Sequence, residues 1–205
     1  MKNTDILKQK LHYYTKSVID KATLLEIIKK RTPGYTIAEA CKRGIVSPLK
    51  KWSYYFIERP GNNYGIFPKS LPYEVGAYYC EWIPYAFGGL GMYNAYGFTT
   101  QLAERYTIYN THYVWEKRIG KFKYIFKKVR ESFFWWIEEY KDYGAKVLSP
   151  ERALIQLIKE GWSKEFLKQK PYWIKINILL ELASKHASKT LLSNIKLLVA
   201  SWKNQ

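Results

Sequence analysis

Cysteine and histidine are scarce in this sequence of 205 residues. It contains two cysteines, Cys41 and Cys80, and three histidines. The cysteines are distant from each other, and neither stands in a CxxC pair or at a Cys/His spacing typical of zinc ligands. We therefore expect no disulfide framework, no metal and no cofactor, and a reduced compartment fits best.

Acidic residues are also few. Lysine and arginine number 34 against 17 aspartates and glutamates, which gives a formal net charge of +17 at pH 7. Residues 1–60 carry 13 basic and 5 acidic side chains, whereas residues 61–110 carry 2 and 3. The basic balance favours nucleic acid or an anionic membrane surface as the partner, and the central segment has the composition of a core.

Segments that would enter or cross a membrane are missing as well. The stretch MKNTDILKQKLHYY is interrupted by charges and has no apolar h-region, so we expect no signal peptide. Residues 82–103 carry no charge over a length that could span a bilayer, but they include Pro84, four glycines, Asn94 and Gln101. The sequence therefore predicts a cytoplasmic protein without a membrane helix.

The glycine-rich stretch GGLGMYNAYGFTTQ, residues 88–101, lacks the pattern of a phosphate-binding loop. It has no G-x-x-x-x-G-K-[ST], and G-x-G-x-x-G fails because Asn94 stands where the third glycine is needed. The better interpretation is structural. Small residues let a helix pack closely, Gly97 ends that helix, and FTTQ leads into the strand RYTIY.

Residues that could carry catalysis occur without a recognisable pattern. The candidates are His12, His112, His186, Glu138, Glu139 and Asp142. The histidines have no evident Ser, Cys or acidic partner, and the carboxylates lack the spacing of a metal-dependent nuclease. We therefore expect no enzyme, with a nucleic-acid-processing enzyme, a nuclease or a glycosylase, as the alternative.

The N-terminal part has the signals of helices followed by a β-hairpin. Apolar periodicity predicts a helix within residues 4–18, and Asp20 or Thr23 caps a second helix that ends in Lys29, Lys30 and Arg31. A short third helix, TIAEACKRG, opens with a capping box of Thr36 and Glu39 and ends at Gly44.

A hairpin is expected next, with IVSPLKKWSYYFIE as one arm, RPGNNYG as the turn and YGIF as the other arm. Helices followed by such a hairpin form the plan of a winged helix-turn-helix, which we assign to residues 1–70. The composition changes near PKSLPYE, where we place a domain boundary at roughly residues 68–74.

Residues 71–205 are expected to form a small α/β domain that ends in a helical region, so the fold class is α+β. Alternation predicts strands in RYTIYNTHYVW and IGKFKYIFKKV. Ser149, Pro150 and Gly161 bracket a well-signalled helix, and residues 163–203 are helical by periodicity. The aromatic run FFWW, residues 133–136, is more typical of a core than of an exposed stacking platform.

Two stretches together resemble the AbiEi-type antitoxins of type IV toxin-antitoxin systems and their transcriptional-regulator relatives. GGLGMYNAYGFTTQLAERYTIYNT is similar to the family's small-residue helix, which runs into a Gly-Leu-Thr-x-Gln-like turn and a strand; Phe98 stands where leucine is usual. KVLSPERALIQLIKEG is similar to the family's strand-to-helix segment with Ser-Pro-Glu-x-Ala-Leu. The order of elements agrees over roughly residues 20–165.

The resemblance implies a DNA-binding autorepressor of its own operon, paired with a nucleotidyltransferase-like toxin and without enzymatic activity. Double-stranded DNA is the expected partner, with an operator of inverted repeats that binds a monomer or a weak dimer. A third possibility is a protein-interaction module that binds no DNA and whose positive charge complements an acidic partner protein.

The expected DNA contacts cluster around the second helix, the short helix and the wing. Any single lysine there is more often ordinary solvated surface, but the whole cluster favours phosphate contacts. The residues are Lys29, Lys30, Arg31, Thr36, Lys42, Arg43, Lys50 and Lys51.

Overall fold

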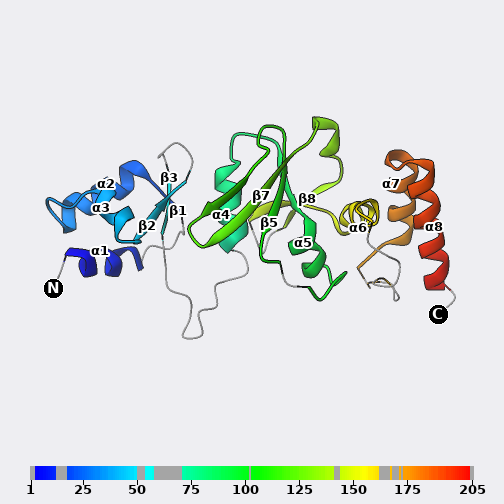
Figure 1. Cartoon of the computed structure of the whole chain (residues 1–205), viewed down its shortest axis with the longest axis horizontal. Helices are drawn as coiled ribbons and strands as arrows, with labels where there is room; N and C mark the ends of the chain where they lie inside the picture. The colour runs from blue at the N-terminus through cyan, green and yellow to red at the C-terminus, as the bar shows by residue number, and fades with distance from the viewer. Residues whose placement is uncertain are drawn as a thin grey trace. The chain divides into compact units, whose positions relative to one another are not determined.

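The computed structural model describes residues 3–12, 18–49, 54–57, 71–101, 103–140, 144–161, 167, 171 and 173–203. The architecture is α+β, as expected, with helices and two sheets along the chain (Figure 1). The chain divides into two compact units. The first comprises Met1–Trp82, Lys117–Tyr124 and Lys141–Gly144, and the second comprises Ile83–Glu116, Ile125–Tyr140 and Ala145–Gln205.

The N-terminal part of the first unit alternates helices and short strands. In chain order they are α1 (Asn3–His12), β1 (Val18–Asp20), α2 (Lys21–Arg31), α3 (Ile37–Lys42), β2 (Val46–Pro48) and β3 (Tyr54–Ile57). The strands form a three-stranded sheet in the order β1-β3-β2, and β3 pairs antiparallel with both neighbours. A core of apolar side chains from α1, α2, α3 and all three strands lies beneath it.

The predicted caps of the two middle helices are confirmed. Asp20 accepts a hydrogen bond from the Thr23 amide at 2.9 Å and so begins α2. Thr36 and Glu39 form the capping box of α3, and Gly44 follows that helix with φ of +62°. Local sequence signals were sufficient here because each cap spans a single turn.

The first helix is shorter than its expected span of residues 4–18, because α1 ends at His12 and Val18 already belongs to β1. The hairpin prediction also needs correction. The expected first arm contains both β2 and β3, which pair antiparallel with Val46 opposite Ile57. Proline has no amide hydrogen for a further ladder bond, which is consistent with β2 ending at Pro48. The expected turn at 59–65 and the run YGIF lie outside the described residues.

A mixed six-stranded sheet follows. Its strands are β4 (Tyr85–Gly88), β5 (Tyr106–Asn110), β6 (Glu116–Ile119), β7 (Phe122–Lys128), β8 (Ile137–Tyr140) and β9 (Ala145–Leu148). The same part of the chain contains the helices α4 (Leu71–Tyr79) and α5 (Gly89–Ala95) and a 3₁₀ turn (Glu131–Phe133). The strand order is β6-β7-β5-β4-β9-β8. β4 pairs parallel with β9 and antiparallel with β5, and β8 pairs antiparallel with β9. Strands are therefore present in both segments where alternation predicted them.

The glycine-rich stretch packs as the structural interpretation expected. A Cβ on Gly88 would lie 2.6 Å from Tyr109 Cε2, and one on Gly89 would lie 2.6 Å from Thr107 Oγ1. Gly97 follows α5 with φ of +69°. Glycine is thus needed for the close approach of α5 to β5.

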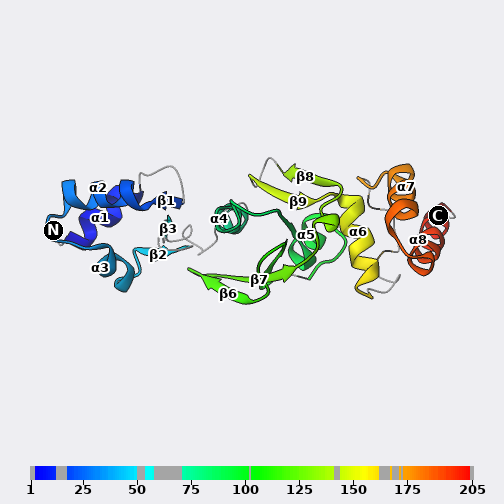
Figure 2. The same ribbon diagram turned by 90° about the horizontal axis from the view of Figure 1, so that it is seen from above.

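Among the described residues after β9, three α-helices follow: α6 (Pro150–Lys159), α7 (Ile176–His186) and α8 (Lys189–Lys203). Ser149 caps α6 by accepting from the Arg152 amide at 3.2 Å, and Gly161 follows it with φ of +85°, as predicted. α6, α7 and α8 pack against one another (Figure 2). Expected helicity is confirmed for residues 176–186 and 189–203, whereas residues 173–175 and 187–188 are not helical.

The expected core position of FFWW is wrong. Phe133, Phe134 and Trp135 are half-buried, and Trp136 is 47% exposed. The run begins at the last residue of the 3₁₀ turn and ends just before β8, so it lies in a connecting segment where no side chain of the run is fully buried.

The predicted domain boundary at 68–74 overlaps residues 58–70, which are outside the described ranges, and the first turn of α4. The assignment of domains to 1–70 and 71–205 stays a prediction. Among the described residues, no helix combines the length and the apolar character needed to cross a bilayer.

Candidate functional site

The expected DNA contacts of the first unit begin at the end of α2. Lys29 and Lys30 are exposed on its last turn, where positive charge is favoured by the helix dipole. Lys30 Nζ lies 2.5 Å from Glu26 Oε1, but both side chains are more than half exposed, so this ion pair holds Lys30 weakly. Arg31 is the last residue of α2.

A second group of expected contacts belongs to α3. Thr36 is exposed, and its hydroxyl is engaged in the capping box, where it also donates to Glu39 Oε2 at 3.0 Å. Lys42 and Arg43 are exposed at the other end of the helix. Lys50 and Lys51 lie outside the described residues.

Packing explains why these cations face outward. Ile27, Ile37 and Cys41 are partly buried against the apolar core of the first unit, so the opposite faces of α2 and α3 carry the polar residues. The two helices contact each other. The structure thus places Lys29 with Lys30, and Lys42 with Arg43, on neighbouring helices; no described contact joins the two pairs.

Three carboxylates near the expected DNA contacts are already engaged locally. Asp20 accepts from both the amide and the hydroxyl of Thr23, and these hydrogen bonds lower the pKa of the Asp20 carboxyl. Glu39 caps α3, and Glu26 pairs with Lys30. Within the described part of the chain, Lys29, Lys42 and Arg43 make no ion pair. They are therefore available to an anionic partner.

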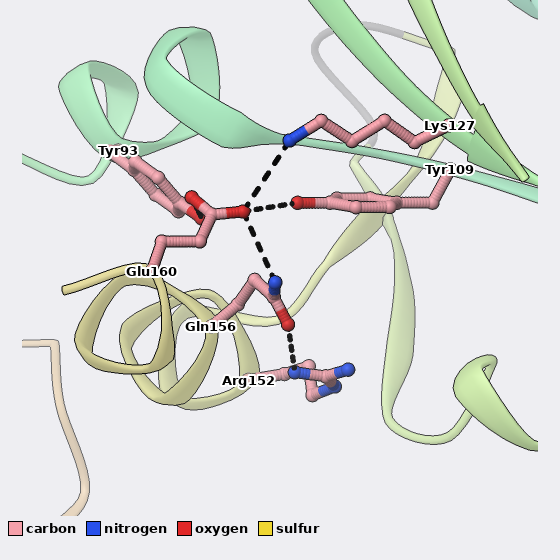
Figure 3. A network of polar contacts seen from close by, with 6 residues as sticks. All are labelled: Tyr93, Tyr109, Lys127, Arg152, Gln156 and Glu160. Atoms are coloured by element: carbon pink, nitrogen blue, oxygen red, sulfur yellow. Dashed lines mark hydrogen bonds and ion pairs between the residues drawn. The ribbon is translucent and has the colours of Figure 1, made fainter. Parts of the chain in front are cut away.

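The second unit holds a polar network around Glu160 (Figure 3). Tyr109 donates to Glu160 Oε1 at 2.9 Å, and Tyr93 donates to Glu160 Oε2 at 3.0 Å. Gln156 Nε2 donates to Oε1 at 3.1 Å, and Lys127 Nζ lies 3.7 Å from the same oxygen. Burial raises the pKa of both tyrosines, which holds them neutral as hydrogen-bond donors.

Arg152 continues this network toward the aromatic run. It is 4% exposed, and its Nη1 donates to Gln156 Oε1 at 3.3 Å. The guanidinium carbon lies 4.5 Å from the ring centre of Phe133 and 4.2 Å from that of Trp135. Burial lowers the pKa of Arg152 to about 10, so the side chain is still charged at neutral pH.

A pocket of about 580 Å³ lies beside this arginine, which we call the Arg152 pocket. Its lining comes from the residues that follow β7, from α6, from the end of α7, and from Ser188 and the first turns of α8. The lining residues are Val129, Arg130, Ser132, Phe133, Trp135, Arg152, Ile155, Gln156, Ile158, Lys159, His186, Ser188, Thr190, Leu191 and Asn194.

Sequence reasoning missed Arg152, Gln156 and Glu160 as a group. Their spacing of four residues places them along one side of α6, which was a readable signal in SPERALIQLIKEG. Their partners Tyr93 and Tyr109 are far away in sequence, so no local pattern could have joined them.

The catalytic candidates are not assembled into a recognisable centre. Glu138 and Glu139 share a shallow pocket by β8, and His112 follows β5 with its ring beside Thr111 Oγ1 at 2.9 Å. Burial and the nearby Glu151 raise the pKa of Glu138. Over the described ranges, no three His, Cys, Asp or Glu residues are grouped to hold a metal ion. His12 is in α1, His186 lines the Arg152 pocket, and Asp142 lies outside the described residues.

Comparison with solved structures gives a likeness over nearly the whole chain. The crystal structure of the RV2827C protein from Mycobacterium tuberculosis matches with a TM-score of 0.64 and 13% sequence identity, covering 97% of this chain and 76% of that one. At this identity the likeness concerns the fold alone. No protein-family model and no curated protein matches the sequence.

Proposed function

We propose that residues 1–70 form a winged helix-turn-helix that binds double-stranded DNA. The observation that carries the proposal is the element order helix, strand, helix, helix, strand, strand around a three-stranded antiparallel sheet. In this arrangement α3 is the recognition helix and β2 with β3 forms the wing. The unpaired cations at the ends of α2 and α3 supply the positive charge that DNA phosphates require.

The length of α3 determines which contacts dominate. Six residues span about 9 Å at 1.5 Å per residue, less than the roughly 12 Å width of the major groove. Such a helix reaches few base edges. Lys42 and Arg43 at its end, with Lys29 and Lys30 on α2, therefore provide a grip in which phosphate contacts supply most of the affinity.

We further propose that the chain acts as a transcriptional autorepressor and antitoxin of the AbiEi type, without enzymatic activity, in the cytoplasm. The support is the resemblance of the two stretches in residues 88–111 and 146–161, together with the basic N-terminal unit. Its partners are then its own operator, built of inverted repeats and bound by a monomer or weak dimer, and a nucleotidyltransferase-like toxin.

The test is fluorescence anisotropy with purified protein and a labelled duplex from the region upstream of its own gene. An unrelated duplex of equal length serves as the competitor. We expect the cognate duplex to bind more tightly at every salt concentration, and specific sites typically exceed non-specific ones by about 10³-fold or more. Equal affinity for the two duplexes would contradict the proposal that the protein is a sequence-specific regulator.

Two controls separate the alternatives. Incubation of the protein with labelled DNA and RNA, with and without divalent metal, should give no cleavage or base release. Turnover that is lost in Glu138→Gln would instead favour the nucleic-acid-processing enzyme. Tight binding of the neighbouring gene's product in the absence of any DNA affinity would favour the protein-interaction module.

A further inference from the structure

We propose that the Arg152 pocket binds a phosphate group, either free phosphate or the phosphate of a small phosphorylated molecule. The pocket lies wholly within the second unit and contains none of the expected DNA contacts. The proposal is thus independent of DNA binding by the first unit.

The charge of the lining favours an anion. Arg130, Arg152 and Lys159 all line the pocket, and no aspartate or glutamate is among the lining residues described. Arg130 and Lys159 are exposed, and neither makes an ion pair within the described part of the chain. Three cations without a carboxylate create a local positive field that a dianion would neutralise.

Arg152 supplies the clearest sign that a partner is missing. Only 4% of the surface of Arg152 is exposed, yet its Nε has no hydrogen-bond partner among the described residues. A buried charged group without its hydrogen bonds is costly, and Gln156 is a neutral partner for only one of its nitrogens. The planar guanidinium is well suited to donate two parallel bonds to phosphate oxygens.

The start of α8 adds donors to the same pocket. This helix has 15 residues; Ser188, which precedes it, and Thr190 and Asn194 from its first turns line the pocket. Ser188 Oγ accepts from the Leu191 amide at 3.3 Å, and the first turn contains no acidic residue to balance the positive end of the helix dipole. An anion seated here is stabilised by the helix and by the arginine together.

The shape and the aromatic contacts favour a small ligand. A volume of about 580 Å³ is within the range of small-molecule sites, roughly 300–1,000 Å³. Trp135 is stacked on His186, with 3.9 Å between the ring centres, and it lies against Arg152. The ring centres of Phe133 and Tyr109 are 4.7 Å apart. These contacts hold the two rings beside the guanidinium of Arg152.

Isothermal titration calorimetry with the full-length protein tests the proposal. The probes are inorganic phosphate, AMP and glucose 6-phosphate, with adenosine and glucose as the unphosphorylated controls. We expect saturable binding of the phosphate-bearing probes and none of the controls. Tighter binding of AMP or glucose 6-phosphate than of phosphate would identify a phosphorylated molecule as the ligand, and equal binding would identify free phosphate.

Matched variants locate the site. Arg130→Ala and Lys159→Ala change exposed side chains, so folding should be retained, and each should weaken phosphate affinity by about tenfold through loss of one charge-assisted contact. Lys196→Ala, on an exposed position of α8 outside the lining, should have no effect. Arg152→Lys retains the charge but loses the two parallel N–H donors of the guanidinium, and it should also weaken phosphate binding.

Three results would overturn the proposal. They are no saturable binding of any phosphate-bearing probe, an equal loss in Lys196→Ala and the pocket variants, and pocket variants that weaken duplex DNA binding while phosphate affinity is unchanged. None of these results bears on Lys42 and Arg43, so failure here is distinct from failure of the DNA-binding proposal.

Discussion

Thr36 and Glu39 hold the first turn of α3 from both sides. The Glu39 amide donates to Thr36 Oγ1 at 3.2 Å, and the Thr36 amide donates to Glu39 Oε2 at 2.8 Å. A helix of six residues has few internal hydrogen bonds of its own, so these reciprocal bonds are a large share of what fixes its start.

Thr36→Ala should therefore lower the free energy of unfolding by about 1 kcal/mol, the usual cost of losing a side-chain cap. Chemical denaturation measures the change. Ser193→Ala, an exposed substitution inside α8, is the control and should change stability by less than about 0.5 kcal/mol. Equal effects of the two substitutions would contradict the capping role.

Gly89→Ala should destabilise the protein more than Gly97→Ala does. Both glycines have positive φ, +66° and +69°, so each substitution carries about 1–2 kcal/mol of backbone strain. A Cβ at Gly89 would also lie 2.6 Å from Thr107 Oγ1, whereas nothing lies within 4 Å at Gly97. Overpacking should add about 1–3 kcal/mol at Gly89 alone. If the two variants unfold at the same denaturant concentration, the close packing of α5 on β5 is wrong.

Glu160→Gln should lower the free energy of unfolding by about 1–3 kcal/mol. Tyr93 and Tyr109 are buried hydroxyl donors that share its two carboxylate oxygens, and an amide offers only one acceptor. Glu104→Gln changes an exposed loop residue and provides the control. A loss in the control as large as in Glu160→Gln would point to a general effect of charge.

Stability should fall above about pH 10, partly because of Tyr93 and Tyr109. Their pKa values are raised in the folded protein, so their contribution is complete below the unfolded value near 10 and is lost as pH rises toward the folded value. Between the unfolded and the folded pKa, each tyrosine that stays neutral in the folded protein lowers the free energy of unfolding by about 1.4 kcal/mol per pH unit. Denaturation at several pH values should show a shallower decline for Tyr93→Phe than for the wild type; identical slopes would contradict the raised pKa.

Signals that act within one or two turns were predictable from the sequence. Asp20, the capping box of Thr36 and Ser149 with Pro150 each place a helix start correctly, because their capping bonds join residues three positions apart. Gly97 and Gly161 follow the helices that they were expected to end, since a positive φ is a local requirement.

Features that depend on distant partners were not predictable. β1 has three residues, and its partner β3 lies more than thirty positions later, so no local alternation marked it. The hairpin error has a different cause, because β2 and β3 are close in sequence and their residues were merged into one arm. Dependence on distant partners also explains why the environment of Arg152 was missed. This residue of α6 packs against Phe133 and Trp135, which belong to the aromatic run that was expected in a core.

The salt dependence of DNA affinity tests the central claim most directly. Each phosphate contact contributes about 0.9 to the slope of log K against log salt concentration. The double variant Lys42→Ala with Arg43→Ala should bind the upstream duplex more weakly and reduce the magnitude of the slope by about two. Lys196→Ala with Lys203→Ala removes the same charge from exposed positions on α8 and should keep the wild-type slope. Identical slopes for the wild type and both double variants would contradict DNA binding through the N-terminal unit.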